Sequence, residues 1–285
     1  MRGLVCGDRR LDLTRPRVMG VLNVTPDSFS DGGELVDSNG CPRRDPIMHR
    51  ASAMVDAGAS LLDIGGESTR PGALTASVAQ EMDRVLPVVE WLLGLDVMIS
   101  VDTSKADVIR EACAVGAHLI NDVRALRSDG ALDALARTSA GVCLMHMRGE
   151  PVTMQAEPVY DDVASEVRNF LAERLLAAQT AGIARSRCVV DPGIGFGKTF
   201  EHNLALLAKL PALDVLGVPV MVGISRKSMI GKLTGRGVKE RVAGSVAAAL
   251  YAVMRGARIV RVHDVAQTVD ALAVWHALAG QDTSQ

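Results

Sequence analysis

The chain has 285 residues, a net charge of −2 and 48% hydrophobic residues, and both signs of charge are mixed along it. This balance excludes the long basic or acidic stretches expected of a protein that binds nucleic acid or an anionic membrane surface. No apolar run reaches the roughly 18 residues of a membrane span, and the N-terminus has no signal-peptide core. The five cysteines are odd in number and form no C-x-x-C pair, so we expect reduced thiols and a cytoplasmic protein.

The chain begins with a short polar–apolar pattern and continues with a regular alternation. Residues 1–17 predict a small β-hairpin that closes the bottom of a barrel. Eight apolar runs follow, each of the length of a strand that is buried on both faces. They are "VMGVLNV" at 18, "LLDIGG" at 61, "VMISVD" at 97, "HLINDV" at 118, "VCLMH" at 142, "CVVDPG" at 188, "PVMVGIS" at 219 and "RIVRVHD" at 258.

Helical patterns separate most of these runs. Ser77 with Gln80, and Ser104 with Asp107, have the spacing of a capping box at the start of a helix. Strands that alternate with helices are typical of a (β/α)8 barrel or of a doubly wound sheet. The count of eight and the absence of any linker favour one (β/α)8 TIM barrel domain over residues 1–285.

Polar residues follow the apolar runs, and in a barrel of this class such strand ends form the site. Asp102, Asn121 and Asp191 end three runs. Their side chains suit the N–H and NH₂ edge of a heterocycle, which they could bind through charge-assisted hydrogen bonds. Either aspartate could instead cap the next helix, although Asp191 precedes a Pro-Gly pair, which weakens that reading.

A cationic group occupies further strand ends, chiefly those of the last two runs, where barrels often bind phosphate. Its members are Arg70, Arg226, Lys227, Arg261 and His263. The alternative for each is a salt bridge to a neighbouring carboxylate, and it is most credible for Arg226.

Aromatic residues are only 3% of the chain, so their positions are informative. Phe29, Phe196 and Phe200 fall in glycine- and serine-rich loops, where rings either contact a flat ligand or anchor the loop. Other chemistries are disfavoured. "DPGIGFGKT" departs from a P-loop at its first glycine, "CLMH" lacks a second pair of zinc ligands, and no G-x-S-x-G occurs.

Taken together, the motifs resemble those of dihydropteroate synthases. The resemblance runs in the family's order over nearly the whole chain. It rests on "MGVLNVTPDSFSDGG", "DIGGESTRPGA", "ISVDTSKADVIREA", "GAHLINDV", "CLMHM", "VVDPGIGFGKT", "GISRKSMIG" and "IVRVHDV".

The resemblance implies a TIM-barrel transferase of folate biosynthesis, usually a homodimer and the target of sulfonamides. Such an enzyme condenses (7,8-dihydropterin-6-yl)methyl diphosphate with 4-aminobenzoate and releases diphosphate, with Mg²⁺. The partners expected are therefore small molecules.

The resemblance also assigns residues. Asn23 matches the residue that meets magnesium and diphosphate, and Arg261 and His263 match diphosphate contacts. The pterin side is matched by Asp102, Asn121, Met145, Asp191, Phe196, Gly223 and Lys227. The aminobenzoate side and its loops are matched by Phe29, Thr69, Arg70, Pro71 and Ser228. Asp102, Lys227, Arg261 and His263 are the expected catalytic residues, and the loop after Asn23 would act as a lid.

Two alternatives remain open, and the chain departs from the family pattern in one place. A pterin-dependent methyltransferase barrel would share the pterin-reading residues, and a non-catalytic pterin-binding paralogue would share more. "SRKS" and "RVHD", which suit an anion, argue against the former, and the intact Asn23, Arg261 and His263 argue against the latter. Residues 34–46 are longer than the family pattern and predict an inserted surface turn.

Overall fold

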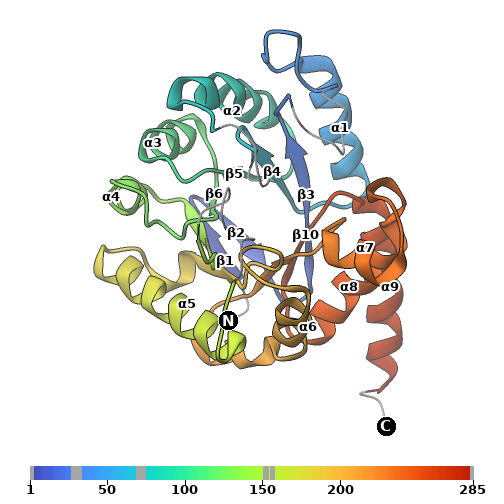
Figure 1. Ribbon diagram of the computed structural model, residues 1–285. Coiled ribbons are helices and arrows are strands. Elements are labelled where there is room, and N and C mark those ends of the chain that lie inside the picture. Colours follow the sequence, from blue (N-terminus) through green and yellow to red (C-terminus); the bar gives the residue numbers. More distant parts are fainter. Residues whose placement is uncertain (1–2, 27–33, 69–74, 150–153, 155–157, 283–285) are drawn as a thin grey trace.

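The computed structural model describes residues 3–26, 34–68, 75–149, 154 and 158–282. Its centre is a ring of parallel strands surrounded by helices (Figure 1). The strands are β3 (Arg17–Asn23), β4 (Leu61–Gly65), β5 (Met98–Asp102), β6 (Leu119–Asp122), β7 (Gly141–Met145), β8 (Cys188–Asp191), β9 (Met221–Gly223) and β10 (Ile259–Val262). Consecutive strands from β3 to β8 pair with each other, and β10 lies between β9 and β3.

The ring is closed between β8 and β9. A parallel bridge joins Val190 to Val220, and the Val190 N–H donates to the Pro219 carbonyl at 3.0 Å. Helices cover the outside and side chains fill the inside, so nearly every strand residue is buried. This explains why the strands are continuous apolar runs rather than alternating patterns. The predicted (β/α)8 barrel is confirmed.

A helix follows each barrel strand, and two follow β9. The helices are α1 (Arg44–Asp56), α2 (Val78–Leu92), α3 (Ala106–Val115), α4 (Ala131–Ala136), α5 (Val163–Thr180), α6 (Phe200–Ala208), α7 (Ser228–Thr234), α8 (Val242–Met254) and α9 (Val265–Asp282). Three short 3₁₀ segments are η1 (Arg185–Arg187), η2 (Leu210–Leu216) and η3 (Val238–Glu240).

Of the capping boxes predicted at Ser77 and Ser104, the one at Ser77 forms. Ser77 caps α2, with the Gln80 N–H donating to Ser77 Oγ and the Gln80 side chain accepting the Ser77 N–H. The box predicted at Ser104 is wrong, because α3 begins at Ala106 without a side-chain cap. Ser104 Oγ donates instead to the buried carboxylate of Asp122 at the end of the neighbouring strand β6.

The N-terminal hairpin closes the bottom of the barrel as predicted. Strands β1 (Gly3–Cys6) and β2 (Arg9–Asp12) place Leu4, Cys6 and Leu11 in a buried cluster with the first inward residues of the barrel strands. That cluster includes Leu13, Met19, Leu61, Met98, Leu119, Cys143, Val189, Met221 and Ile259. At Gly141 a Cβ atom would lie 2.7 Å from Cys6 Sγ, so the close contact of hairpin and barrel requires glycine there.

The segment expected to be an insertion forms a tight turn at the top of Figure 1. Leu35 and Val36 are buried, and the Asp37 carboxylate accepts the N–H groups of Asn39 and Cys41. Helix α1 begins at Arg44, so the last three residues of the range 34–46 belong to that helix. That this turn is an insertion relative to the family stays a prediction.

Candidate active site

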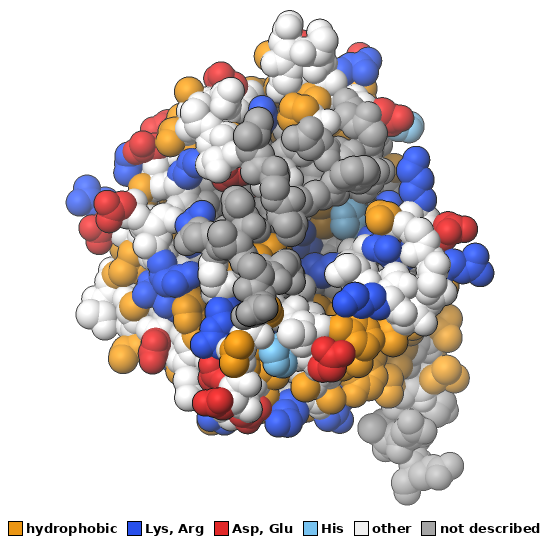
Figure 2. Space-filling model, viewed as in Figure 1, with side chains coloured by type: hydrophobic (Ala, Val, Ile, Leu, Met, Phe, Trp, Pro, Cys, Tyr) orange, Lys and Arg blue, Asp and Glu red, His pale blue; other side chains and the backbone are white. Residues whose placement is uncertain are grey.

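A cavity of about 450 Å³ opens at the carboxyl ends of the barrel strands. Figure 2 shows it as a hollow beside Lys, Arg and His side chains. Its lining includes the predicted residues Asn23, Asp102, Asn121, Met145, Asp191, Phe196, Gly223, Lys227, Ser228, Arg261 and His263. The predicted residues Phe29, Thr69, Arg70 and Pro71, and with them the predicted lid, lie outside the described residues.

Asp63, a residue that the sequence analysis missed, organises the floor of the cavity. It lies in the middle of β4 and is fully buried. Its carboxylate accepts hydrogen bonds from Ser100 Oγ at 2.5 Å, Asn121 Nδ2 at 2.9 Å and Arg261 Nε at 2.6 Å. An aspartate inside a strand that is buried on both faces was the available signal, since a buried charge requires partners.

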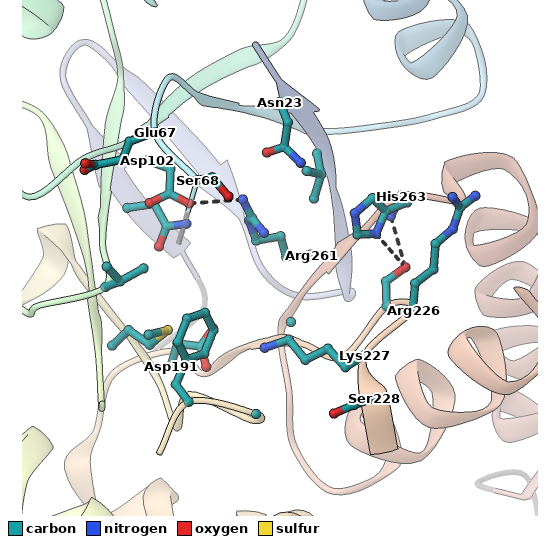
Figure 3. Close-up of a pocket in the computed structure, with 18 of the residues that line it drawn as sticks. Asn23, Glu67, Ser68, Asp102, Asp191, Arg226, Lys227, Ser228, Arg261 and His263 are labelled. Atoms are coloured by element: carbon teal, nitrogen blue, oxygen red, sulfur yellow. Dashed lines mark hydrogen bonds and ion pairs between the residues drawn. The ribbon is translucent and has the colours of Figure 1, made fainter. Parts of the chain in front are cut away.

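Arg261 joins Asp63 to Asp102, because its Nη2 donates to Asp102 Oδ2 at 3.2 Å (Figure 3). Two carboxylates thus share one guanidinium. The Asp63 carboxylate accepts from three donors. Asp102 has one, and burial together with the neighbouring Asp63 charge raises the pKa of Asp102 to about 8.

The Asp63 carboxylate also orients the amide of Asn121. Because Nδ2 of Asn121 donates to Asp63, its Oδ1 remains as the acceptor for a bound molecule. Asn121 and Asp102 are cross-strand neighbours on β6 and β5, so their oxygens lie side by side in the cavity.

Asp191 and Lys227 form the opposite side of the polar wall. Asp191 Oδ1 accepts the Gly193 N–H at 2.7 Å, and its other oxygen makes no hydrogen bond to the described residues. Burial raises the pKa of Asp191, whereas the Lys227 charge lowers it. Lys227 points into the cavity toward Asp191 (Figure 3), and burial lowers the pKa of Lys227 to about 8.

A flat apolar surface completes this half of the cavity. The Phe196 ring packs on a cluster formed by Val123, Met145, Met147 and Met154. Lys227 Nζ lies 4.4 Å from the centre of the Phe196 ring. The methionine thioethers are polarizable, and the Lys227 ammonium lies over the Phe196 ring. Groups of this kind suit contact with the faces of a planar aromatic ligand.

The half of the cavity beside β9, β10 and α7 contains basic and hydroxyl groups. His263 Nδ1 lies 3.0 Å from Ser225 Oγ, and Ser228 begins α7 at the cavity wall. Arg226 makes a bidentate ion pair with Asp264, through Nε–Oδ2 at 3.0 Å and Nη2–Oδ1 at 2.5 Å. The salt-bridge reading of Arg226 is therefore confirmed.

Asn23, the predicted metal ligand, ends β3 above Arg261 (Figure 3). A Cβ at Gly65 on the adjacent strand would lie 3.0 Å from Asn23 Oδ1, so this glycine leaves room for the amide. Within the described part of the chain, no group of three or more His, Cys, Asp or Glu side chains could hold a metal ion.

The geometry therefore offers two adjoining half-sites. One presents acceptors in line with an apolar slot and can bind a planar ring through its N–H edge. The other presents cationic and hydroxyl groups and can bind an anion at the ring's far end.

No helix of the described chain is long and apolar enough to cross a membrane.

Comparison with known proteins accounts for this arrangement. The family described as pterin binding enzyme matches residues 19–263. The dihydropteroate synthase of Escherichia coli K12 is 53% identical over 268 residues, which cover 93% of this chain and 92% of the relative.

Two crystal structures are similar throughout. Yersinia pestis dihydropteroate synthase with a sulfonamide drug complex has a TM-score of 0.92 and 50% identity, covering 98% of this chain and 99% of its own. Burkholderia cenocepacia dihydropteroate synthase with 7,8-dihydropteroate has a TM-score of 0.89 and 49% identity, covering 99% and 98%. The chain is thus a pterin binding enzyme. Within that class it belongs to the dihydropteroate synthases, which are transferases.

Proposed function

We propose that this cavity condenses (7,8-dihydropterin-6-yl)methyl diphosphate with 4-aminobenzoate to 7,8-dihydropteroate and diphosphate. The observation that carries the proposal is the pairing of the two half-sites. The acceptors of Asp191 and Asn121 adjoin the Phe196 slot, and the basic residues of β10 follow at the next strand ends. A pterin with a diphosphate substituent has the matching donor edge, flat ring and anionic end.

Catalysis here is positioning and electrostatic stabilisation. The bond between the pterin methylene carbon and the diphosphate oxygen breaks, and its electron pair leaves with diphosphate. The aryl amine then attacks the methylene carbon and loses one proton. An aryl amine is already nucleophilic, so Asp102 and Asp191 need only hold the pterin, while Lys227, Arg261 and His263 stabilise charge.

Magnesium fits this site as a partner of the diphosphate rather than of the protein alone. Asn23 supplies one neutral oxygen, and Mg²⁺ is generally bound through one or two protein groups, substrate phosphates and water. When bound it would neutralise phosphate charge. Calorimetry should show weak Mg²⁺ binding to the protein alone and tighter binding with inorganic diphosphate. Tight binding without diphosphate would contradict this role.

The assembly is proposed to be a homodimer in the cytoplasm. Exposed apolar side chains gather on α6 to α9 (Figure 2), and they include Leu204, Leu233, Tyr251 and Met254. Contiguous apolar surface of this kind marks a protein contact. Analytical ultracentrifugation should show a dimer that Met254→Glu dissociates, and a monomeric wild type would refute the assembly.

The function is tested by incubating the protein with the pterin diphosphate, 4-aminobenzoate and Mg²⁺. Consumption of both substrates with stoichiometric release of diphosphate supports it. Pterin binding without turnover would favour the non-catalytic paralogue, and methyl transfer from a methylated pterin would favour the methyltransferase.

A second titration tests the order of binding. If diphosphate and the pterin complete the aminobenzoate site, a sulfonamide should bind weakly to the protein alone and tightly when both are present. Apparent affinity scales with the fraction of protein that is competent to bind. Equal affinity in the two conditions would show that the aminobenzoate site is preformed.

A further inference from the structure

The loop between β8 and α6 folds around a buried lysine at its own end. Lys198 is 2% exposed. Its Nζ donates to the carbonyls of Gly193 and Phe196, each at 2.9 Å, and lies 2.9 Å from His146 Nδ1. Nζ also lies 3.5 Å from the His146 carbonyl oxygen. An ammonium has three N–H donors, so each of them has an acceptor here.

The partners of this ammonium are neutral. His146 must accept through Nδ1, so its proton is on Nε2. Burial, together with the Lys198 charge, lowers the pKa of His146 to about 2, consistent with a neutral ring. The His146 ring is itself held edge-on by Phe170, with the ring centres 4.9 Å apart. Burying lysine without a directly bonded carboxylate is costly, and an apolar residue could have filled the same space.

The loop presents its other side to the pterin half-site. The Gly193 N–H donates to Asp191 Oδ1, and the Ile194 carbonyl accepts from Lys227 Nζ. Phe196 supplies the ring beneath Lys227. Three groups of that half-site, the Asp191 carboxylate, the Lys227 ammonium and the Phe196 ring, therefore depend on the shape of one short loop.

Without a donor at its centre, the backbone of this loop would be unfavourable in the observed conformation. Gly193 has φ of 69°, and a Cβ there would lie 1.8 Å from the His146 carbonyl oxygen. The backbone thus passes directly over β7, and the Gly193 and Phe196 carbonyls both turn inward to one point. Carbonyls that converge in this way repel each other unless a donor lies between them.

We propose that Lys198 is a positioning residue of the pterin half-site, because its ammonium gathers the Gly193 and Phe196 carbonyls and so fixes the loop against Asp191 and Lys227. Lys198 does not line the cavity. The inference rests on the proposed function for the identity of the ligand as a pterin.

The test is Lys198→Met, which keeps an unbranched chain of similar length and removes the donors. We expect the Kd for 6-hydroxymethyl-7,8-dihydropterin to rise about tenfold or more, because buried acceptors lose their partner. The Kd for inorganic diphosphate with Mg²⁺ should stay within about twofold, since that half-site stands on β9 and β10. The matched control is Lys209→Met, whose side chain is 58% exposed, and it should change neither constant.

A pair of substitutions at His146 guards against simple loss of folding. His146→Gln retains an acceptor for the Lys198 ammonium and should keep most of the pterin affinity. His146→Leu removes the acceptor and should weaken pterin binding in the direction of Lys198→Met, though less. Equal loss of pterin and diphosphate binding in Lys198→Met, or equal behaviour of the two His146 variants, would overturn the inference.

The proposed function is judged separately by wild-type turnover. A wild type that binds the pterin without condensing it, together with the selective loss in Lys198→Met, would refute the proposed function and leave the positioning role standing. Normal turnover of the wild type, together with unchanged pterin affinity in Lys198→Met, would support the proposed function and refute the positioning role.

Discussion

The two ends of the barrel are built by the same strands and yet differ in nearly every chemical property. At the amino ends, Met19, Leu61 and Met98 pack under the hairpin with no charged member in the cluster. At the carboxyl ends of the same three strands, Asn23 and Asp102 face a cavity floored by Asp63. One end is filled with apolar side chains. The other contains ionisable groups, and two of its carboxylates, Asp63 and Asp102, pair with the same guanidinium of Arg261.

This difference separates stability from activity along a strand only a few residues long. Apolar burial at the amino end favours folding. Desolvated carboxylates at the other end oppose it, and the raised pKa values of Asp102 and Asp191 report that cost. Substitutions at the two ends should therefore act on different observables.

The largest expected effect is on stability at the hairpin end. Leu4→Ala removes a fully buried side chain from the cluster and should lower the free energy of unfolding by ~2–5 kcal/mol. The kcat of the folded protein should be unchanged, because the cluster lies at the opposite end from the cavity. Urea unfolding and steady-state kinetics on the same preparation measure both.

The control for that substitution is Leu176→Ala, the same change at a side chain that is 66% exposed on α5. It should alter stability by only ~0.5 kcal/mol or less. A large fall in kcat for Leu4→Ala would show that the two ends are coupled through the strands.

The next effect is on ligand affinity at the carboxyl end. Asp191→Asn replaces a charged acceptor by an amide and should cost ~1.5–3 kcal/mol of pterin binding, which is roughly a tenfold to hundredfold rise in Kd. Calorimetry with the dihydropterin measures it, and Asp107→Asn on the surface of α3 provides the matched control. Unchanged affinity would remove Asp191 from the pterin site.

The smallest effect, when the change in stability is counted per pH unit, comes from the titration of Asp102. The pKa of Asp102 is raised on folding to about 8, so its contribution to stability is complete below its unfolded pKa of about 3.9 and is lost as pH rises through about 8. Between these limits the wild type should lose stability relative to Asp102→Asn by at most ~1.4 kcal/mol per pH unit, with no further loss above that range. Urea unfolding of both proteins from about pH 5 to about pH 9 gives the two slopes. Parallel slopes would mean that Asp102 is ionised throughout.

Most of the architecture could be predicted from the sequence because it rests on local signals. The apolar runs, the hairpin before the first of them and the Ser77 cap are each written in a few adjacent residues. The polar strand ends predicted the cavity for the same reason, since every parallel strand of a barrel ends at one rim.

What could not be predicted depends on pairs that are distant in the sequence. Asp63 reads as one residue of an apolar run until Arg261 and Asn121 are known to meet it. Ser104 has the spacing of a cap, but Asp122 on the next strand takes its hydroxyl. The same holds for charge, because the pKa of Asp102 is raised by burial and by Asp63 on the neighbouring strand, and neither cause can be read from adjacent residues.

The hairpin across the barrel bottom has a kinetic consequence. Because the hairpin closes one end of the barrel, ligands can reach the cavity only through the opening at the carboxyl ends of the strands. If the pterin occupies the half-site of Asp191, Asn121 and Phe196 as proposed, it has to enter before the aminobenzoate, and it can leave only as part of the product or after the outer ligand has gone. The ligand that binds last should therefore dissociate first. Aminobenzoate analogues that occupy the opening should slow pterin dissociation without contacting the pterin.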